Sequence, residues 1–244
     1  MTYCSRVSPN VKTFIISDTH FFHANIIKYC HRPWLQDGDL GRDDNWASRE
    51  IKAERAREMD EFLISQWNAT VGPDDDVWHC GDLAFGPKAG DEGHIILLLK
   101  QLNGNIHLIK GNHDHATKAF WESQGVDFYE HGYHIINGVL LSHYPTYIER
   151  RSDFTDSLKM QRIKNNMKRI YTKNHCRYII YGHTHRWTSP EPCSYNACVD
   201  VNDFQPIGVN FDAGDVGDIV PVKHYTPVFG SNFEMRGAKN TKVY

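Results

Sequence analysis

Five short clusters of acidic, amide and imidazole residues are spread along the chain, in which 15 of 244 residues are histidine. The clusters are Asp18-Thr19-His20, Gly81-Asp82, Gly111-Asn112-His113-Asp114, His143 and Gly182-His183-Thr184-His185. Carboxylate, carboxamide and imidazole groups are ligands for divalent transition metals, and this chemistry needs no cysteine. The residue types therefore point to a metal site.

Each cluster comes directly after a short apolar run that predicts a buried strand. These runs cover residues 12–17, 77–80, 106–110, 139–142 and 178–181. Because ligands bind at the carboxyl ends of strands in α/β sheets, we expect the five clusters to converge. A lone histidine such as His143 is usually an ordinary core or surface residue. The shared position after a strand is what predicts one common site.

The spacing within the clusters suits two metal ions. Asp18 and His20 lie two residues apart, as do His183 and His185, so in extended chain both members of a pair point the same way. Asp82 has two carboxylate oxygens and can bridge two ions. Two metal ions clamp a phosphoryl group and acidify water to hydroxide near neutral pH. The pattern predicts a dinuclear centre that hydrolyses a phosphate ester.

Helices are predicted between the strands by apolar residues at helical spacing. They cover residues 46–67, 94–102 and 153–173. Asn137-Gly138 predicts a β-hairpin, and the alternation in residues 196–202 predicts a further strand. Strands that alternate with helices, together with a hairpin, indicate an α/β fold with mixed sheets.

The composition excludes several alternatives. A formal net charge of −3 gives no general attraction to nucleic acids or acidic membranes. Six scattered cysteines without a C-x-x-C pair predict free thiols rather than a zinc ribbon or a disulfide framework. The chain shows no signal peptide and no apolar run of membrane-spanning length. We expect a cytoplasmic protein with no membrane and no obligate protein partner.

The ordered motifs resemble those of the calcineurin-like metallophosphoesterases, most specifically at residues 111–114 and 182–185. The resemblance covers residues 13–186 and implies a four-layer αββα sandwich of two mixed sheets flanked by helices. We expect residues 1–244 to form one domain, with a β-rich closure and tail in residues 187–244. The resemblance also implies two divalent metal ions, with Mn expected and Fe, Zn, Ni or Co as alternatives.

The resemblance further implies roles for individual residues. One ion would be held by Asp18, His20, Asp82 and His185, and the other by Asp82, Asn112, His143 and His183. His113 would not be a ligand but would protonate the leaving oxygen or stabilise the phosphate. Asp114 would orient the ring of His113 and raise its pKa.

The chain departs from the Ser/Thr protein phosphatases of this superfamily after Asp82. Their motif continues to an Arg that contacts a phosphomonoester, whereas this chain reads Leu83-Ala84-Phe85-Gly86-Pro87. We therefore expect a phosphodiesterase acting on a nucleotide or on single-stranded nucleic acid. The alternatives are a small-molecule or protein phosphomonoesterase and a catalytically inactive binding module. The completeness of the ligand set argues against inactivity.

The segments Phe21-Phe22-His23-Ala24-Asn25-Ile26-Ile27 and Arg32-Pro33-Trp34 resemble a bacterial and phage subgroup of these phosphoesterases. His23, Asn25 and Arg32 are expected substrate contacts, although His23 is equally suited to cap or pack the first helix. Asp200 is expected to have a structural role.

Residues 150–173 contain eight Lys or Arg against two Asp. They predict either a surface that attracts a polyanion or an ordinary solvated helix face.

Overall fold

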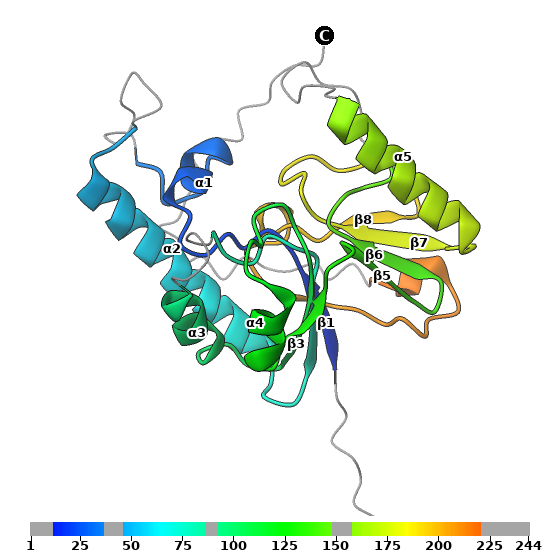
Figure 1. Cartoon of the computed structure of the whole chain (residues 1–244), viewed down its shortest axis with the longest axis horizontal. Coiled ribbons are helices and arrows are strands. Elements are labelled where there is room, and N and C mark those ends of the chain that lie inside the picture. Colours follow the sequence, from blue (N-terminus) through cyan, green and yellow to red (C-terminus); the bar gives the residue numbers. More distant parts are fainter. Residues whose placement is uncertain (1–11, 37–45, 86–91, 148–157, 221–244) are drawn as a thin grey trace, which may run out of the picture.

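Two β-sheets pack face to face in the computed structural model, which describes residues 12–36, 46–85, 92–147 and 158–220 (Figure 1). The first sheet has the strand order β4-β3-β2-β1-β9, in which β1 to β4 are parallel and β9 is antiparallel to β1. Its strands are β1 (Thr13–Ile16), β2 (Asp76–His79), β3 (Asn105–Ile109), β4 (Asp127–Tyr129) and β9 (Ile207–Gly208).

The second sheet has the order β5-β6-β7-β8 and is also mixed. β5 and β6 form an antiparallel hairpin across Asn137-Gly138, and β6, β7 and β8 are parallel. Its strands are β5 (Tyr133–Ile136), β6 (Val139–Ser142), β7 (Tyr178–Tyr181) and β8 (Ser194–Asn196). Asn137 and Gly138 both have positive φ, as the hairpin turn requires.

Side chains of successive strand residues enter different hydrophobic layers. Phe14 and Ile16 of β1 face the helices, whereas Ile15 packs between the two sheets. In β7, Ile180 packs between the sheets and Ile179 faces the opposite side. Both faces of each sheet are thus covered, which explains why these strands read as continuous apolar runs.

Helices cover the two outer faces (Figure 1). The outer face of the first sheet packs against α1 (Ala24–Tyr29), α2 (Arg49–Thr70), α3 (Gly93–Leu99) and α4 (Lys118–Ser123). The outer face of the second sheet packs against Met167 and Ile170 of α5 (Leu158–Lys173). The predicted αββα sandwich with two mixed sheets is confirmed.

The predicted strands that precede the ligand clusters all form, with bounds that shift by a residue or two at most. The three predicted helices correspond to α2, α3 and α5, although residues 153–157 of the last lie outside the described residues. The short elements α4, β4 and β9 were not predicted. They carry too few residues to show a clear periodicity.

The strand predicted at residues 196–202 is wrong. β8 ends at Asn196, and a 3₁₀ helix, η2, follows at Val199–Val201. The side chain of Asn202 donates to the carbonyl oxygens of Asn196 at 2.9 Å and Cys198 at 2.8 Å. These local side-chain bonds fold the segment back and compete with strand pairing.

The described part of the chain agrees with the prediction of free thiols. Its cysteines, Cys30, Cys80, Cys176, Cys193 and Cys198, are all free thiols. Within the described residues, no helix has the length and apolar character needed to cross a membrane.

Candidate metal centre

The five predicted clusters meet where the carboxyl ends of β1, β2 and β3 face those of β6 and β7. Asp18, His20, Asp82 and His143 are almost fully buried there. The sequence prediction that these segments converge is therefore supported by the positions of the side chains.

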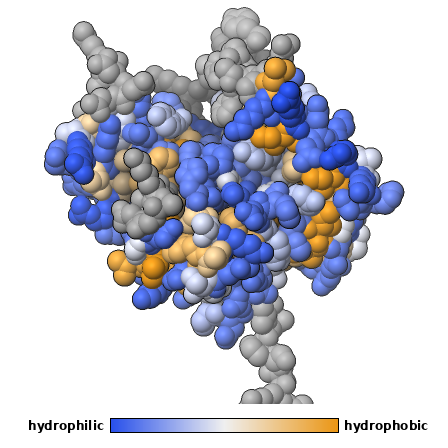
Figure 2. Space-filling view, viewed as in Figure 1, coloured by the Kyte–Doolittle hydropathy of each residue, from blue (hydrophilic) through white to orange (hydrophobic). Residues whose placement is uncertain are grey.

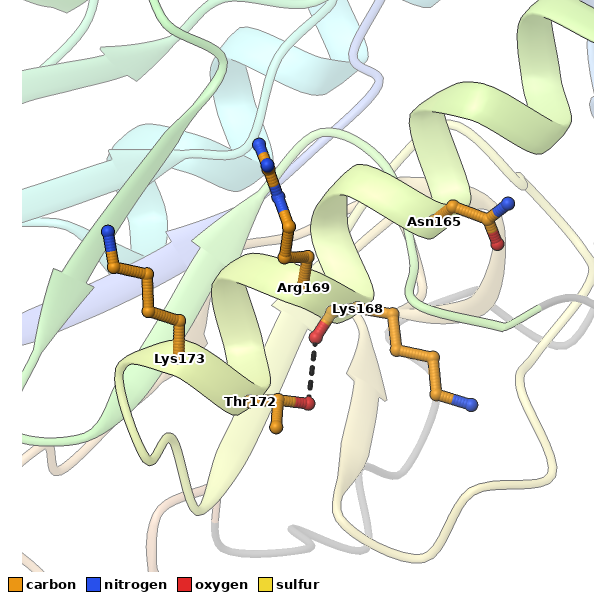
Figure 3. A pocket seen from close by; sticks show the side chains of 5 residues that line it. All are labelled: Asn165, Lys168, Arg169, Thr172 and Lys173. Carbon is orange, nitrogen blue, oxygen red and sulfur yellow. Dashed lines mark hydrogen bonds between the residues drawn. The ribbon is translucent and has the colours of Figure 1, made fainter.

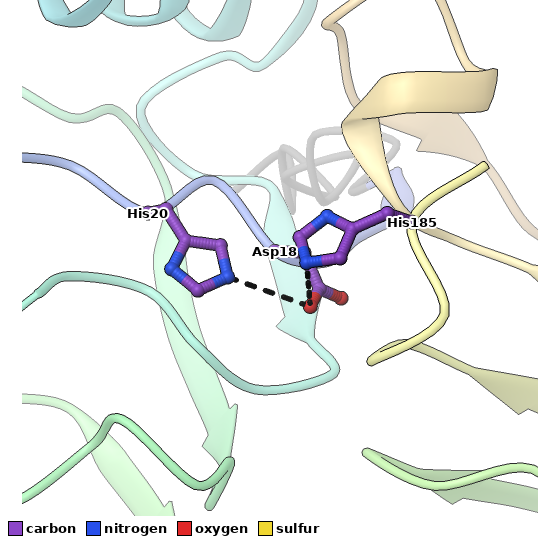
Figure 4. A group of neighbouring side chains, drawn as sticks. All are labelled: Asp18, His20 and His185. Carbon is purple, nitrogen blue, oxygen red and sulfur yellow. Dashed lines mark ion pairs between the residues drawn. The ribbon is translucent and has the colours of Figure 1, made fainter. Parts of the chain in front are cut away.

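Asp18, His20 and His185 form one group of possible ligands (Figure 4). The Oδ1 atom of Asp18 lies 3.8 Å from Nε2 of His20 and 3.8 Å from Nε2 of His185. Two atoms that each bond one ion at about 2 Å lie roughly 3–4 Å apart. The spacing of these three side chains suits a single ion.

Asp82, Asn112, His143 and His183 form a second group. Nε2 of His143 lies 3.5 Å from Oδ2 of Asp82, 3.0 Å from Oδ1 of Asn112 and 3.2 Å from Nδ1 of His183. Nδ1 of His143 lies 2.9 Å from the carbonyl oxygen of Cys80. Because a carbonyl oxygen only accepts, Nδ1 donates in this contact and Nε2 is the ring nitrogen that faces the other three side chains.

Asp82 lies between the two groups. Its Oδ2 atom is 3.5 Å from Nε2 of His20 and 3.5 Å from Nε2 of His143. Its other oxygen, Oδ1, accepts a hydrogen bond of 2.8 Å from the backbone N–H of His113. One carboxylate oxygen thus faces both groups while the other fixes its orientation.

The chemistry of this cluster fits divalent cations. Oδ1 of Asp18 and Nε2 of His20 are buried and have no hydrogen-bond partner among the described residues, which is rare and costly. Burial holds the pKa of His20 well below its usual range and lowers that of His183 to about 3, so both rings are neutral. Burial raises the pKa of Asp82 to about 7. Cations would satisfy the unpaired atoms and favour the ionised form of Asp82.

Five of the seven expected ligands have left-handed backbone conformations. The φ angles are 56° at Asp18, 52° at His20, 57° at Asp82, 69° at His183 and 48° at His185. Such residues are uncommon and cost about 1–3 kcal/mol each when strained. The paired side chains therefore converge because of these conformations, and not because the chain is regularly extended as their spacing suggested.

Position 182 requires a glycine because the backbone there approaches the loop after β1 closely. A Cβ atom at this position would collide with Oγ of Ser17 and Oδ2 of Asp18. The absence of a side chain lets the loop after β7 reach the loop after β1. The backbone N–H of His183 then donates to Oδ2 of Asp18 at 2.9 Å.

His113 lies beside the cluster, but Asp114 does not contact its ring among the described hydrogen bonds. The ring of His113 is half-buried, with its centroid 5.2 Å from that of His20. The buried carboxylate of Asp114 accepts from the backbone N–H groups of Asp82 at 2.8 Å, Leu83 at 3.0 Å and Gly111 at 2.8 Å. Asp114 therefore joins two loops instead of orienting its neighbour.

The expectation that Asp114 raises the pKa of His113 is corrected for the same reason. Burial lowers the pKa of His113, and the neighbouring His115 adds to this effect. The expected rise in pKa required a carboxylate partner at the ring, and the oxygens of Asp114 are occupied by backbone groups.

Arg32 is not placed to contact a substrate. It is 1% exposed, and it binds Asp200 through Nε at 2.9 Å and Nη2 at 3.0 Å. Nη2 also donates to the backbone oxygen of Asp18 at 2.7 Å, and Nη1 donates to that of Thr19 at 2.9 Å. The guanidinium group is saturated by protein acceptors, so the expected substrate contact is replaced by support for the first ligand loop.

Asp200 links Arg32 to the candidate ligand His185. Its Oδ2 atom lies 2.7 Å from Nδ1 of His185, which leaves Nε2 facing Asp18. The thiol of Cys30 lies near the same two side chains. The structural role expected for Asp200 is consistent with these contacts, but its link to a ligand was not predicted. An isolated acid 15 residues after His185 carries no sequence signal for this contact.

His23 and Asn25 differ in their distance from the cluster. Nδ1 of His23 lies 3.2 Å from Nδ1 of His20, so His23 borders the candidate centre. It occupies the N-cap position of α1, but its side chain makes no capping bond. Oδ1 of Asn25 accepts from the indole of Trp46 at 3.2 Å, which ties α1 to the segment before α2.

Comparison with known proteins agrees with this geometry. Residues 11–187 match the family model described as calcineurin-like phosphoesterase. The uncharacterised protein MJ1445 of Methanocaldococcus jannaschii is 32% identical over 208 residues, which cover 82% of this chain and 88% of that protein. The gene 66 protein of Mycobacterium phage L5 is 28% identical over 158 residues, which cover 54% of this chain and 67% of that protein.

A solved structure is also similar. The crystal structure of AQ665, a protein of unknown function from Aquifex aeolicus, gives a TM-score of 0.55 at 26% sequence identity. The similarity covers 82% of this chain and 96% of that one. The matched family segment contains all five ligand clusters.

Replacement of Asp200 tests whether the Arg32–Asp200 pair supports the metal centre. Asp200→Asn removes the charge that holds Nδ1 of His185, so we expect the affinity for Mn²⁺ to fall by about 10-fold or more. Isothermal titration of chelator-treated protein measures this affinity. Asp203→Asn, an exposed change three residues away, is the matched control. Equal affinity in the Asp200 variant and the unaltered protein would refute the link.

Proposed function

Because this chain belongs to the calcineurin-like phosphoesterase family, we propose that it is a hydrolase that uses two divalent metal ions to cleave phosphodiesters of nucleotides or nucleic acids. The observation that carries this proposal is the position of Asp82. One of its oxygens lies 3.5 Å from imidazole nitrogens of both ligand groups. A carboxylate that faces both groups could be shared by two ions.

The proposed ligand sets follow the two groups. One ion would be held by Asp18, His20, Asp82 and His185, and the other by Asp82, Asn112, His143 and His183. When bound, the ions supply positive charge to the phosphate and acidify water. Nitrogen and oxygen donors of this kind accept Mn, Fe, Zn, Ni or Co, and we propose Mn as the working metal.

We propose His113 as the residue that assists the leaving oxygen. Its backbone N–H is fixed by Asp82, which places the side chain beside the cluster. Its pKa is low because of burial and nearby histidines. An anionic phosphate beside the ring would favour its protonated form, which can then donate the proton to the departing oxygen.

The preference for a diester rests on the residues that follow Asp82. Residues 83–87 contain no Lys or Arg, and Gly86 stands where the motif of the related phosphatases has an Arg. A phosphomonoester dianion carries more negative charge than a diester and needs more positive partners. The alternative of a phosphomonoesterase is therefore less well supported.

The surface of α5 supports a polyanionic substrate. The helix carries six Lys or Arg and no acidic residue. Figure 2 shows hydrophilic side chains in the region of α5 with hydrophobic ones among them, and Leu158 at the start of the helix is 71% exposed. Five of its residues line a hollow of about 460 Å³, and three of them are basic (Figure 3). The lining residues are Asn165, Lys168, Arg169, Thr172 and Lys173. None of them is a candidate ligand, so this hollow is separate from the metal centre.

The amino half of α5 extends toward the side of the molecule where the centre lies. Oγ of Ser142, the residue before His143, lies 3.0 Å from Sδ of Met167. Because α5 connects the parallel strands β6 and β7, residues 158–166 continue past the carboxyl end of β6 by about 13 Å at 1.5 Å per residue. The basic residues Lys159 and Arg162 lie in this half and are exposed.

Asp82→Asn tests the proposed bridge. The variant should lose more than about 10-fold in Mn²⁺ affinity, because a ligand should matter at least as much as its supporting groups. Hydrolysis of bis(p-nitrophenyl) phosphate should fall with it. Metal analysis and a Mn²⁺-dependent assay measure both effects, with exposed Asp74→Asn as control. Full activity and full metal content in Asp82→Asn would disprove the bridging assignment.

His113→Ala separates catalysis from metal binding. Metal content should stay unchanged, while turnover of a diester with an alkyl leaving group should fall by about 100-fold or more. The loss should be smaller for p-nitrophenolate, which departs without a proton. The control is His115→Ala, an exposed neighbour. An equal loss for both leaving groups would exclude proton donation by His113.

Charge reversal on α5 tests the polyanion surface. Arg162→Glu with Lys168→Glu should raise KM for a single-stranded oligonucleotide and lower the salt dependence by about one unit of log-log slope per lost phosphate contact. KM for bis(p-nitrophenyl) phosphate should not change. Arg57→Glu with Lys100→Glu removes as much exposed positive charge elsewhere. Unchanged oligonucleotide kinetics at low salt would contradict a role for α5.

A further inference from the structure

Two exposed aromatic residues contact one histidine beside His113, and this histidine, His23, is itself only 8% exposed. The ring of Phe85 stacks on His23 with a centroid distance of 4.0 Å and an interplanar angle of 13°. Tyr29 meets the same histidine edge-on at 6.4 Å. Phe85 is 40% exposed and Tyr29 is 63% exposed. We name His23, Phe85 and Tyr29 the aromatic shelf.

The aromatic shelf adjoins the residue proposed to assist the leaving group. The ring centroid of His113 lies 5.5 Å from that of Phe85 and 5.8 Å from that of His23. Single exposed apolar residues are ordinary on protein surfaces. Here two large aromatic side chains contact the same histidine next to the candidate active site, so they form a cluster and are not single exposed residues.

The backbone holds the aromatic shelf in place. The N–H of Phe85 donates to the carbonyl oxygen of Phe21 at 2.8 Å, and the N–H of Phe21 donates to that of Leu83 at 3.0 Å. The N–H of His23 donates to the carbonyl oxygen of His20 at 3.1 Å. Neither Phe85 nor Tyr29 belongs to the hydrophobic core clusters of the described residues. Their rings are thus positioned without a packing role in the interior.

We propose that the aromatic shelf is a stacking subsite for a planar ring, a nucleobase in a nucleic-acid substrate, carried by the group that leaves with the scissile oxygen. The inference rests on the proposed function, because His113 marks the leaving-group side only if it assists departure. Phe85 supplies the exposed π-face, and His23 supports it from behind. Stacking of this kind accepts any base, so it selects for the presence of a base and not for its identity.

Dinucleoside monophosphates with one base replaced by an abasic residue isolate this contact. The ester chemistry is the same in every compound, and only the ring on one side of the phosphate is lost. With Mn²⁺, we expect kcat/KM to fall by about 10-fold when the base is missing on the leaving side, and much less when it is missing on the other. Product analysis identifies which oxygen leaves.

Variants of the aromatic shelf complete the test. In Phe85→Ala the ratio of kcat/KM between the full and the abasic substrate should fall toward one, and Phe85→Leu should retain part of it. Leu97→Ala, which removes a more exposed apolar residue from α3, should keep the ratio of the unaltered protein. A ratio that Phe85→Ala leaves unchanged overturns the proposal.

A binding measurement separates the subsite from the proposed reaction. A dinucleotide that contains 2-aminopurine loses fluorescence when its base stacks, and it can be titrated without added metal. We expect quenching and about 10-fold weaker binding to Phe85→Ala. Quenching in this titration, together with no hydrolysis when Mn²⁺ is added, would support the subsite and refute the proposed function. Hydrolysis of bis(p-nitrophenyl) phosphate without quenching or base preference would refute the subsite alone.

Discussion

The architecture depends on the burial of one carboxylate, that of Asp18, which is 0% exposed. Its Oδ2 atom accepts three hydrogen bonds, from the hydroxyl of Ser17 at 2.5 Å, the thiol of Cys198 at 3.1 Å and the backbone N–H of His183 at 2.9 Å. These donors come from the loops after β1 and β7 and from the segment after β8. A buried charge is tolerated only when it is paired and hydrogen-bonded, so the two sheets must meet correctly for Asp18 to be stable. The close approach at Gly182 follows from the same requirement.

Further side chains hold the loops and ligands around this carboxylate in place. Arg32 binds the backbone of the first ligand loop and also the carboxylate of Asp200, which in turn holds His185. Asp114 performs a similar task on the other side by accepting from the loops after β2 and β3. Arg32 and Asp114 stand inside or close to the ligand motifs, so both could be mistaken for participants in the reaction. Their oxygens and nitrogens are instead occupied by the protein, which fixes the geometry of the residues that face the centre.

The sequence reveals the strands and the ligand clusters more readily than it reveals their support. Strands buried on both faces read as apolar runs, and a cluster of Asp, Asn and His after each run is a local pattern. The Arg32–Asp200 pair spans 168 residues, and no local pattern can show such a contact. The left-handed backbone at His20 and His185 was not predicted either, because residues other than glycine adopt it uncommonly and no local sequence pattern marks these positions. Short elements such as β9 exist because a neighbouring strand offers an edge, which is a property of the assembled sheet.

The placement of the ligand groups on both sheets has a mechanical consequence. Asp18, His20 and Asp82 follow strands of the first sheet, whereas His143 and His185 follow strands of the second. In the proposed dinuclear state each ion would therefore cross-link the two layers of the sandwich, much as a disulfide joins distant segments. Sliding of one sheet over the other would break several coordination bonds at once. The same centre that is proposed to act on phosphate esters would then also limit shear within the fold, and loss of metal would loosen the sandwich at the edge where the ligand clusters meet.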